Sequence, residues 1–136
     1  MAIPEDDRLP KPRGGVARIF RAFFYSMSGI KSALQHEAAF RQDMMMGILL
    51  VPLSLWLPLD TTMKVLLNVI WLLLLTTELL NSAIEAIVDM TSPGYHELAK
   101  RAKDMGSAAV FMMLTSLTVA WVVALWPIVA KYLTTK

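Results

Sequence analysis

The sequence contains no cysteine, which excludes thiol catalysis, disulfide bonds and thiolate metal sites. It also contains neither a G-x-x-x-x-G-K-[ST] loop nor a G-x-G-x-x-G turn, so the two common glycine-rich phosphate-binding motifs are excluded. The opening stretch MAIPEDDRLPKPRGG is charged and rich in proline and glycine, and it lacks the apolar core of a signal peptide. We therefore expect residues 1–15 to form a flexible tail.

Hydrophobic residues dominate what is present. They make up 56% of the 136 residues, so lipid rather than water is the expected environment of most of the surface. The length is that of a single domain, which we place at residues 16–136. The formal net charge is only +2, and no nucleic-acid partner is expected.

Three apolar segments are candidates for membrane spans, at about residues 38–59, 63–89 and 105–130. A helical crossing needs about 20 residues. The apolar part of the first segment is shorter than this, and extending it toward the N-terminus places Arg41 and Asp43 near a membrane interface. The third segment carries no charged residue and is the clearest span. The expected fold is an all-α membrane protein with three transmembrane helices.

The stretch before the first span, about residues 16–35, is predicted to be an amphipathic surface helix. In VARIFRAFFYSMSGIKSALQ the apolar residues recur at helical spacing, while basic and polar residues occupy much of the rest. A basic, aromatic-rich helix of this kind lies flat in the headgroup region of a membrane. The alternative is a half-buried helix of a soluble domain, but the neighbouring spans favour the membrane.

The basic residues are distributed unevenly along the chain. Seven precede the apolar core of the first span, the first connection holds only Lys64, and the second connection, TSPGYHELAKRAK, holds three. Because positively charged connections stay in the cytoplasm, the N-terminus and second connection are predicted to be cytoplasmic and the C-terminus outside. Trp56 and Trp126 then fall near outer ends of spans, whereas Trp71 and Trp121 lie deeper and are interpreted as packing residues.

The second span ends in ELLNSAIEAIVD, where polar residues follow one another at spacings of three and four: Glu78, Asn81, Glu85 and Asp89. On a helix these steps return to nearly the same face. A charged residue at mid-bilayer costs about 2.5–3.5 kcal/mol on insertion scales. Each residue alone has a structural interpretation, as a neutral carboxyl, an interhelical amide or a partner of the basic connection. Together they are interpreted as one functional face.

Two further clusters flank the predicted cytoplasmic side. HEAAFRQD places Glu37 and Arg41 one helical turn apart at the entry to the first span. RAKDMGSAA carries Lys103 and Asp104 shortly before Ser107, in a run of small residues that permits close helix approach. Taken alone, each charged cluster is explained equally well by an ordinary ion pair.

Convergence of these clusters would create a metal-capable site. Glu37, Glu85 and Asp89 could meet at one depth, near Lys103 and Arg18. Carboxylates that hold Mg²⁺ and cations that neutralise phosphate oxygens are what a magnesium-bound polyphosphate requires. The residues alone leave open whether such a site serves an enzyme, an ion pathway or a proton relay.

The strings EAAFRQD, ELLNSAIEAIVD and YHELAKRAKDMGSAAV resemble the signature segments of the prokaryotic diacylglycerol kinase family, which are small integral-membrane enzymes. The resemblance covers about residues 18–126, with the motifs in the family's order. It implies a homotrimer of three-span protomers, each with an N-terminal surface helix, in the bacterial cytoplasmic (inner) membrane. It also implies transfer of the γ-phosphoryl group of ATP to the primary hydroxyl of diacylglycerol, giving phosphatidic acid at the cytoplasmic face.

The resemblance implies roles for individual residues on the lipid and metal side. Glu78 would be the general base that takes the proton from the lipid hydroxyl, and Asn81 would orient it. Ser107 would join Glu78 in contacting the lipid. Glu37 and Glu85 would hold the Mg²⁺ that bridges the ATP phosphates, and would thereby take part in nucleotide binding.

The remaining implied roles concern the nucleotide. Lys103 would contact phosphate oxygens, and Asp104 would help to bind the nucleotide. Arg18 on the surface helix matches a family arginine near the active site. Asp89 is assigned a structural or positioning role.

Two alternatives to the diacylglycerol kinase hypothesis are retained. The first is undecaprenol kinase, because some family members phosphorylate that polyprenyl alcohol instead. The second, from another class, is a proton- or cation-conducting membrane oligomer with Glu78 and Glu85 as relay sites. That alternative predicts polar residues in the outer half of a span, where the second span offers only Asn68. A purely structural membrane subunit would leave the polar stripe unexplained.

Overall fold

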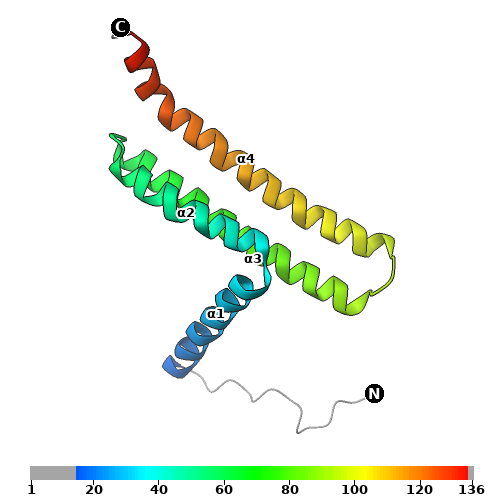
Figure 1. The fold of residues 1–136 in the computed structure, drawn as a ribbon. Helices are drawn as coiled ribbons and strands as arrows, with labels where there is room; N and C mark the ends of the chain where they lie inside the picture. The colour runs from blue at the N-terminus through cyan, green and yellow to red at the C-terminus, as the bar shows by residue number, and fades with distance from the viewer. Residues whose placement is uncertain (1–14, 135–136) are drawn as a thin grey trace, which may run out of the picture. The chain divides into compact units, whose positions relative to one another are not determined.

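The computed structural model describes residues 15–134, and the predicted tail therefore falls outside the described residues except for Gly15. Within that range the chain is helical and contains no strand. The helices, joined by short connections, are α1 (Val16–His36), α2 (Ala38–Trp56), α3 (Thr61–Thr91) and α4 (Glu97–Thr134) (Figure 1). The prediction of an all-α fold is confirmed.

The chain divides into two compact units, and α1 crosses the boundary between them. The first unit ends at Ser32 and the second begins at Ala33. In the first unit, large apolar side chains of α1 are exposed: Val16, Ile19, Phe20, Phe23, Phe24 and Tyr25. The rings of Phe23 and Phe24 meet edge to face, with centroids 5.9 Å apart. This unit thus presents an apolar, aromatic surface.

Three helices of the second unit can cross a membrane. α2, α3 and α4 contain 19, 31 and 38 residues and are apolar enough for spans, which confirms the prediction of three spans. At 1.5 Å per residue α3 is about 46 Å long and α4 about 57 Å, whereas the hydrocarbon core of a bilayer is about 30 Å thick. α3 and α4 are therefore longer than the core of a bilayer.

Local sequence explains the turn between α2 and α3. Leu57 has the extended backbone (φ −63°, ψ 148°) that is favoured for a residue before proline, here Pro58, and α2 ends there. The carboxylate of Asp60 then accepts a hydrogen bond from the backbone N–H of Met63 at 3.0 Å. This N-cap satisfies one of the free donors at the start of α3.

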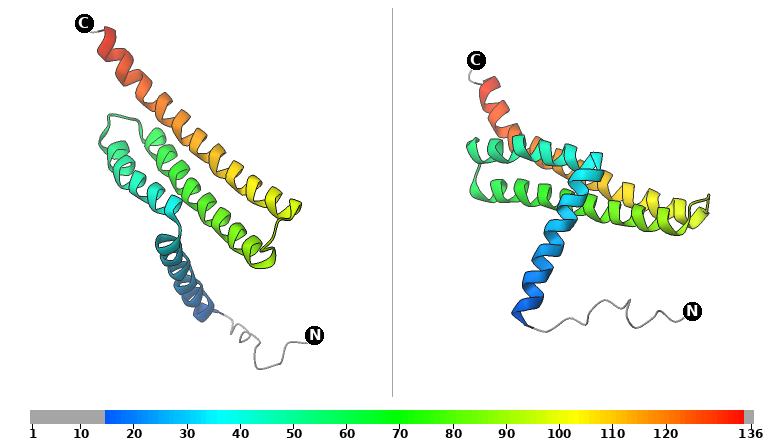
Figure 2. Two further views of the ribbon diagram at one scale, coloured as in Figure 1. Left: turned by 45° about the vertical axis from the view of Figure 1, so that its right-hand side comes forward. Right: turned by 60° about the horizontal axis from the view of Figure 1, so that its bottom comes forward.

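The second unit is built around α3, which packs against both α2 and α4 (Figures 1 and 2). Neighbouring helices run antiparallel because each connection is short. Leu67 of α3 is buried together with Ala120 and Ala124 of α4. Small residues at these positions let the helix backbones approach closely, which is the usual packing mode of membrane helices.

Two hydrogen bonds fix the register between α2 and α3. Asn68 Nδ2 donates to Ser54 Oγ at 2.8 Å, and Trp71 Nε1 donates to the backbone oxygen of Asp43 at 3.1 Å. Because the helices are antiparallel, residues further along α3 face residues nearer the start of α2. Glu78, two turns beyond Trp71, is thereby brought level with the first turns of α2.

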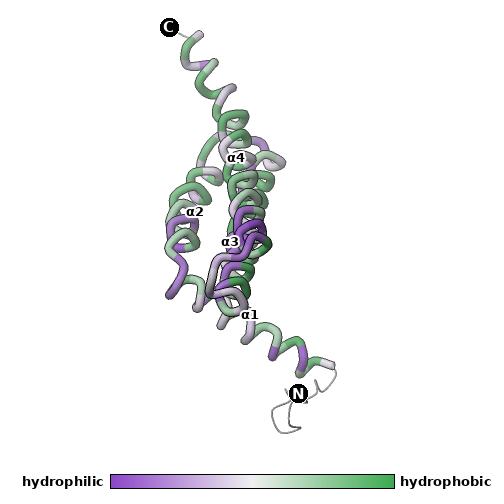
Figure 3. The backbone as a smooth tube through the Cα atoms, turned by 90° about the vertical axis from the view of Figure 1, so that its right-hand side faces the viewer, coloured by the Kyte–Doolittle hydropathy of each residue, from purple (hydrophilic) through white to green (hydrophobic). Residues whose placement is uncertain are grey.

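Hydropathy divides the second unit along its length. Figure 3 looks toward the end of the molecule where α3 connects to α4. Hydrophobic residues cover much of α2, α3 and α4, and hydrophilic residues gather near the label of α3. The polar residues of the candidate site belong to this end.

Candidate active site at the α3–α4 end

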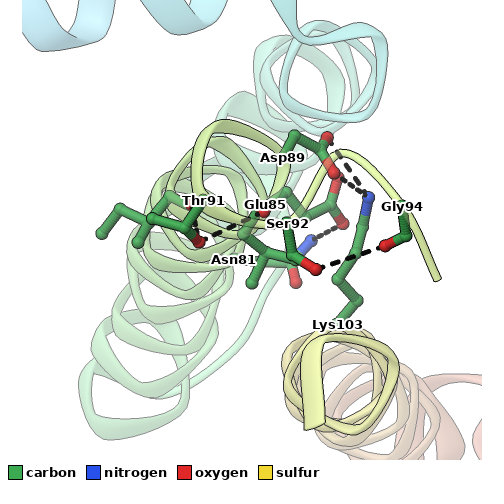
Figure 4. Close-up of polar contacts among 9 residues, drawn as sticks. Asn81, Glu85, Asp89, Thr91, Ser92, Gly94 and Lys103 are labelled. Atoms are coloured by element: carbon green, nitrogen blue, oxygen red, sulfur yellow. Dashed lines mark hydrogen bonds and ion pairs between the residues drawn. The ribbon is translucent and has the colours of Figure 1, made fainter. Parts of the chain in front are cut away.

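The polar stripe predicted for the second span lies on the half of α3 that leads to α4. Glu78 is buried, with 6% of its surface exposed. Asn81 and Glu85 are half-buried, and Asp89 is exposed. Figure 4 shows the last three following one another along α3, with Lys103 of α4 beside them. Accessibility therefore increases along the stripe toward the connection.

Asn81 is held in one orientation by its neighbours. Its Nδ2 donates a hydrogen bond to Oε1 of Glu85 at 3.0 Å, one turn along α3 (Figure 4). Its Oδ1 is buried and has no hydrogen-bond partner among the described residues. A Cβ atom at Gly106 of α4 would overlap this oxygen, so glycine leaves the space that Asn81 occupies. Since buried amide oxygens are normally bonded, Asn81 presents an unused acceptor.

Basic side chains of α4 are paired with acids at this end. Lys103 Nζ lies 3.0 and 3.3 Å from the two carboxylate oxygens of Asp89 on α3 (Figure 4). The charge of Glu85 also acts on Lys103. Lys100 Nζ lies 2.6 Å from Oδ2 of Asp104, one turn further along α4. The predicted phosphate ligand Lys103 therefore links α4 to the stripe on α3.

The junction between α1 and α2 supplies Glu37. This residue is the N-cap of α2, with extended backbone, and its side chain makes no capping hydrogen bond. Arg41 Nη1 donates to the backbone oxygens of Leu34 at 3.2 Å and Gln35 at 3.3 Å, which satisfies carbonyl groups at the end of α1. Arg41 thereby fixes the turn from which Glu37 projects.

A buried acid on α2 was not assigned a role from sequence. Asp43 is 9% exposed, and its Oδ2 is buried without a partner among the described residues. The negative charges of Asp43, Glu85 and Glu37 each act on Glu78, so Asp43 belongs to the surroundings of the polar stripe. Helical spacing in the sequence could have predicted the burial of Asp43, because it shares one face of α2 with three other residues. The buried residues of this face are Phe40, Asp43, Gly47 and Ser54.

The carboxylates fit one kind of metal binding. Within residues 15–134 no three His, Asp or Glu side chains come close enough to hold a metal ion by themselves. Mg²⁺ in nucleotide sites is usually bound through one or two carboxylates, with phosphate and water completing the octahedron. Glu37 and Glu85 are oxygen donors whose charges act on Glu78, and Lys103, which is paired with Asp89, is a cation that can contact phosphate. The donor set therefore fits Mg²⁺ that arrives with a nucleotide, not a metal held by protein alone.

An open pocket of about 470 Å³ lies at the connection between α3 and α4. Its lining includes Asp89, Tyr95, His96, Lys100, Lys103 and Asp104. His96 caps α4, because its Nδ1 accepts a hydrogen bond from the backbone N–H of Leu98 at 3.2 Å. The volume falls in the range of small-molecule sites, about 300–1,000 Å³. A pocket with two lysines and an exposed aromatic ring suits an anionic ligand that carries an aromatic ring, such as a nucleobase.

The predicted roles of two other residues remain predictions. Ser107 is exposed on α4, one residue after buried Gly106. Arg18 lies in the first unit.

The end of the α2–α3 pair nearer the Asp60 turn is closely packed around Asn68. Asn68 Nδ2 bonds both Ser54 Oγ and the backbone oxygen of Lys64, each at 2.8 Å. The adjoining gap, lined in part by Trp71 and Trp121, leaves no room for a water molecule. Asn68 therefore serves interhelical packing.

These features define a multi-pass helical membrane protein with a carboxylate-rich site at the α3–α4 end of its helices. The family model of the prokaryotic diacylglycerol kinases matches residues 24–125. The chain therefore belongs to the prokaryotic diacylglycerol kinase family.

Individual relatives cover most of the chain. It is 45% identical over 112 residues to the diacylglycerol kinase of Escherichia coli (strain K12), covering 82% of this chain and 92% of that protein. It is 46% identical over 111 residues to the diacylglycerol kinase of Pseudomonas aeruginosa, covering 82% and 90%. Identity to the diacylglycerol kinase of Helicobacter pylori is 40% over 116 residues, covering 85% and 91%.

Proposed function

We propose that this protein is an ATP-dependent diacylglycerol kinase, which phosphorylates the primary hydroxyl of diacylglycerol to give phosphatidic acid. The observation that carries the proposal is the buried carboxylate of Glu78, 6% exposed, one turn from the unused acceptor of Asn81. Membership of the family and the names of the relatives support the same activity.

The length of α3 supports a reaction at the membrane boundary. Thr61 begins the helix, and the 17 residues to Glu78 span about 26 Å at 1.5 Å per residue. If α3 enters the hydrocarbon at its first turn, Glu78 lies near the far edge of a core about 30 Å thick. Glu85 and Asp89 then lie in the headgroup region or beyond. A lipid hydroxyl reaches Glu78 from the bilayer, while a soluble nucleotide approaches from the connection.

The pocket at the connection suits the nucleotide. Its two lysines, Lys100 and Lys103, carry positive charge toward phosphate oxygens, and the exposed ring of Tyr95 offers a flat face for a base. Asp104 lines the same pocket, in agreement with its predicted role in nucleotide binding. Glu37 and Glu85 would hold Mg²⁺ on the phosphates, where the metal neutralises negative charge during transfer.

The residues of the chain supply positioning and proton transfer. Asn81, fixed by Glu85, orients the acceptor hydroxyl through its free amide oxygen. Glu78 accepts the hydroxyl proton as the lipid oxygen forms a bond to the γ-phosphorus and the bond from that phosphorus to the oxygen of ADP breaks. Lys103 stabilises the phosphate oxygens during the transfer. Phosphoryl transfer demands mainly positioning and charge neutralisation, so a compact site of this kind suffices without a glycine-rich loop.

The assembly and placement of the chain form part of the proposal. We place the protein in the bacterial inner membrane as a homotrimer, with a cytoplasmic N-terminus and an external C-terminus. The exposed aromatic and apolar side chains of α1 suit a helix lying in the headgroup region. This placement brings the charged α3–α4 connection to the cytoplasm, in agreement with the positive-inside rule.

The decisive experiment assays the purified protein with Mg²⁺ and ATP labelled at the γ-phosphate, offering diacylglycerol and undecaprenol in separate reactions. Label in phosphatidic acid is the expected result. Label only in undecaprenyl phosphate would replace the proposed acceptor with that of the alternative. Label in neither lipid would contradict a lipid kinase altogether.

A further inference from the structure

Trp71 of α3 packs against Gly47 of α2, where the absence of a side chain makes room for the indole. A Cβ atom at Gly47 would overlap the six-membered ring of Trp71, and it would also meet the indole nitrogen. Gly47 is buried and Trp71 half-buried. The indole therefore rests directly against the backbone of α2.

The same indole bonds the turn of α2 that ends at Gly47. Trp71 Nε1 donates to the backbone oxygen of Asp43 at 3.1 Å. Asp43 and Gly47 are four residues apart, so one turn of α2 supplies both the acceptor and the gap. The contact consequently sets the depth and the rotation of the turn that carries the Asp43 side chain.

The Asp43 side chain is buried, and its charge acts on the proposed base Glu78. It is 9% exposed, and its Oδ2 has no hydrogen-bond partner among the described residues. Trp71 and Glu78 are seven residues apart, which places them on the same face of α3. A buried carboxyl oxygen without a partner is unfavourable, and the acceptor lipid, whose hydroxyl must reach Glu78, is the molecule that can approach it.

We propose that Trp71 is a positioning residue for the acceptor lipid, which acts by holding the turn that carries Asp43, so that the carboxyl groups of Asp43 and Glu78 together bound the place of the reacting hydroxyl. The inference rests on the proposed kinase function. It adds a second role to the interpretation of Trp71 as a packing residue, because its N–H donates to the turn that carries Asp43.

The proposal predicts an effect on the lipid and not on the nucleotide. Trp71→Phe keeps an aromatic ring against Gly47 but removes the N–H donor. Interhelical hydrogen bonds in membranes contribute little to stability, so the variant should fold and assemble. We expect kcat/KM for diacylglycerol to fall about five- to tenfold, as for one lost hydrogen bond of ordinary strength. The KM for ATP should stay within about twofold.

The matched control is Trp121→Phe. Trp121 is also half-buried and packs against the cluster of Leu67, Ala120 and Ala124. The same chemical change there should leave lipid kinetics within about twofold. A fall of equal size in both variants would indicate general packing and would overturn the proposal.

A double-mutant cycle tests whether Trp71 acts through Asp43. Asp43→Asn and Trp71→Phe should be non-additive, with the double variant no worse than Asp43→Asn alone, because residues that act as one unit couple. Additive losses, or unchanged lipid kinetics in Trp71→Phe, would overturn the inference while the wild type still phosphorylated diacylglycerol. An inactive wild type would instead contradict the proposed function itself.

Discussion

Lys103 of α4 and Asp89 of α3 form an ion pair across the open pocket, with Nζ 3.0 Å from Oδ1. Their side chains are 38% and 66% exposed, and exposed pairs of this kind contribute little to stability. The pair instead locates the lysine, which lines the pocket together with Asp89 and for which a phosphate contact is proposed.

Substitutions of the two partners should therefore have unequal effects. Lys103→Ala removes the proposed contact to phosphate and should raise the KM for ATP by about tenfold or more, since hydrogen bonds to charged groups are the stronger kind. Asp89→Asn removes only the pairing and should change the KM for ATP by less than about threefold. Steady-state kinetics with varied ATP measure both. Equal losses would show that the ion pair, rather than a phosphate contact, accounts for the role of Lys103.

Replacement of Glu78 by Gln should nearly abolish turnover. The amide is similar in size but cannot accept the proton of the hydroxyl, and a general base contributes about 10²- to 10⁴-fold. ATP binding and oligomer assembly should remain, because the pocket lies at the α3–α4 connection. Glu97→Gln, at the exposed first turn of α4, is the control and should retain turnover. Near-normal turnover of Glu78→Gln would show that another group accepts the proton.

We propose two separable roles for Glu85, binding of Mg²⁺ and orientation of Asn81, and two variants distinguish them. Glu85→Gln retains an oxygen that can accept the hydrogen bond from Asn81 Nδ2, observed at 3.0 Å, but loses the negative charge that holds Mg²⁺. The Mg²⁺ concentration for half-maximal activity should rise about tenfold or more, with kcat largely recovered at saturation.

Glu85→Ala loses both duties. It should show the same shift in Mg²⁺ dependence together with a lower kcat that excess Mg²⁺ does not restore. Titration of activity with Mg²⁺ after removal of metal by a chelator measures both parameters. A Mg²⁺ dependence identical to that of the wild type in both variants would leave Glu85 with the positioning duty alone.

The close approach of α4 to Asn81 can be tested at Gly106. A Cβ atom at this position would overlap Asn81 Oδ1, so Gly106→Ala should displace the amide and lower kcat about tenfold, the effect of one misplaced hydrogen-bonding group. Gly29→Ala is the matched control, because nothing lies within 4 Å of a Cβ atom there. It should retain activity and stabilise α1 by up to about 1 kcal/mol. Equal kinetics of the two variants would argue against the contact.

Much of the fold and part of the site follow from local sequence. Length and hydropathy predicted the three spans, because these properties belong to each segment by itself. The stripe of Glu78, Asn81, Glu85 and Asp89 was predictable because helical spacing alone places its members on one face. The bond between Asn81 and Glu85 is a direct consequence of that spacing.

Contacts between helices were harder to predict. The burial of Asp43 and the seat of Trp71 on Gly47 depend on the register and rotation of α2 against α3. A change of one residue in this register turns a helical side chain by about 100°, which is enough to move Asp43 from the interface to the lipid. Hydropathy placed Asp43 near the membrane surface and carried no information about its facing helix.

The fit of an indole to a bare stretch of backbone also constrains how this chain can change. Volume added at position 47 has to be removed at position 71, because interiors are close-packed and neither helix can move aside without shifting the other. In a library randomised at both positions, functional clones should carry compensating pairs of side chains. Substitutions at positions 47 and 71 would therefore have to occur together. A chimera that takes α2 from a relative would also require that relative's residue at position 71 of α3.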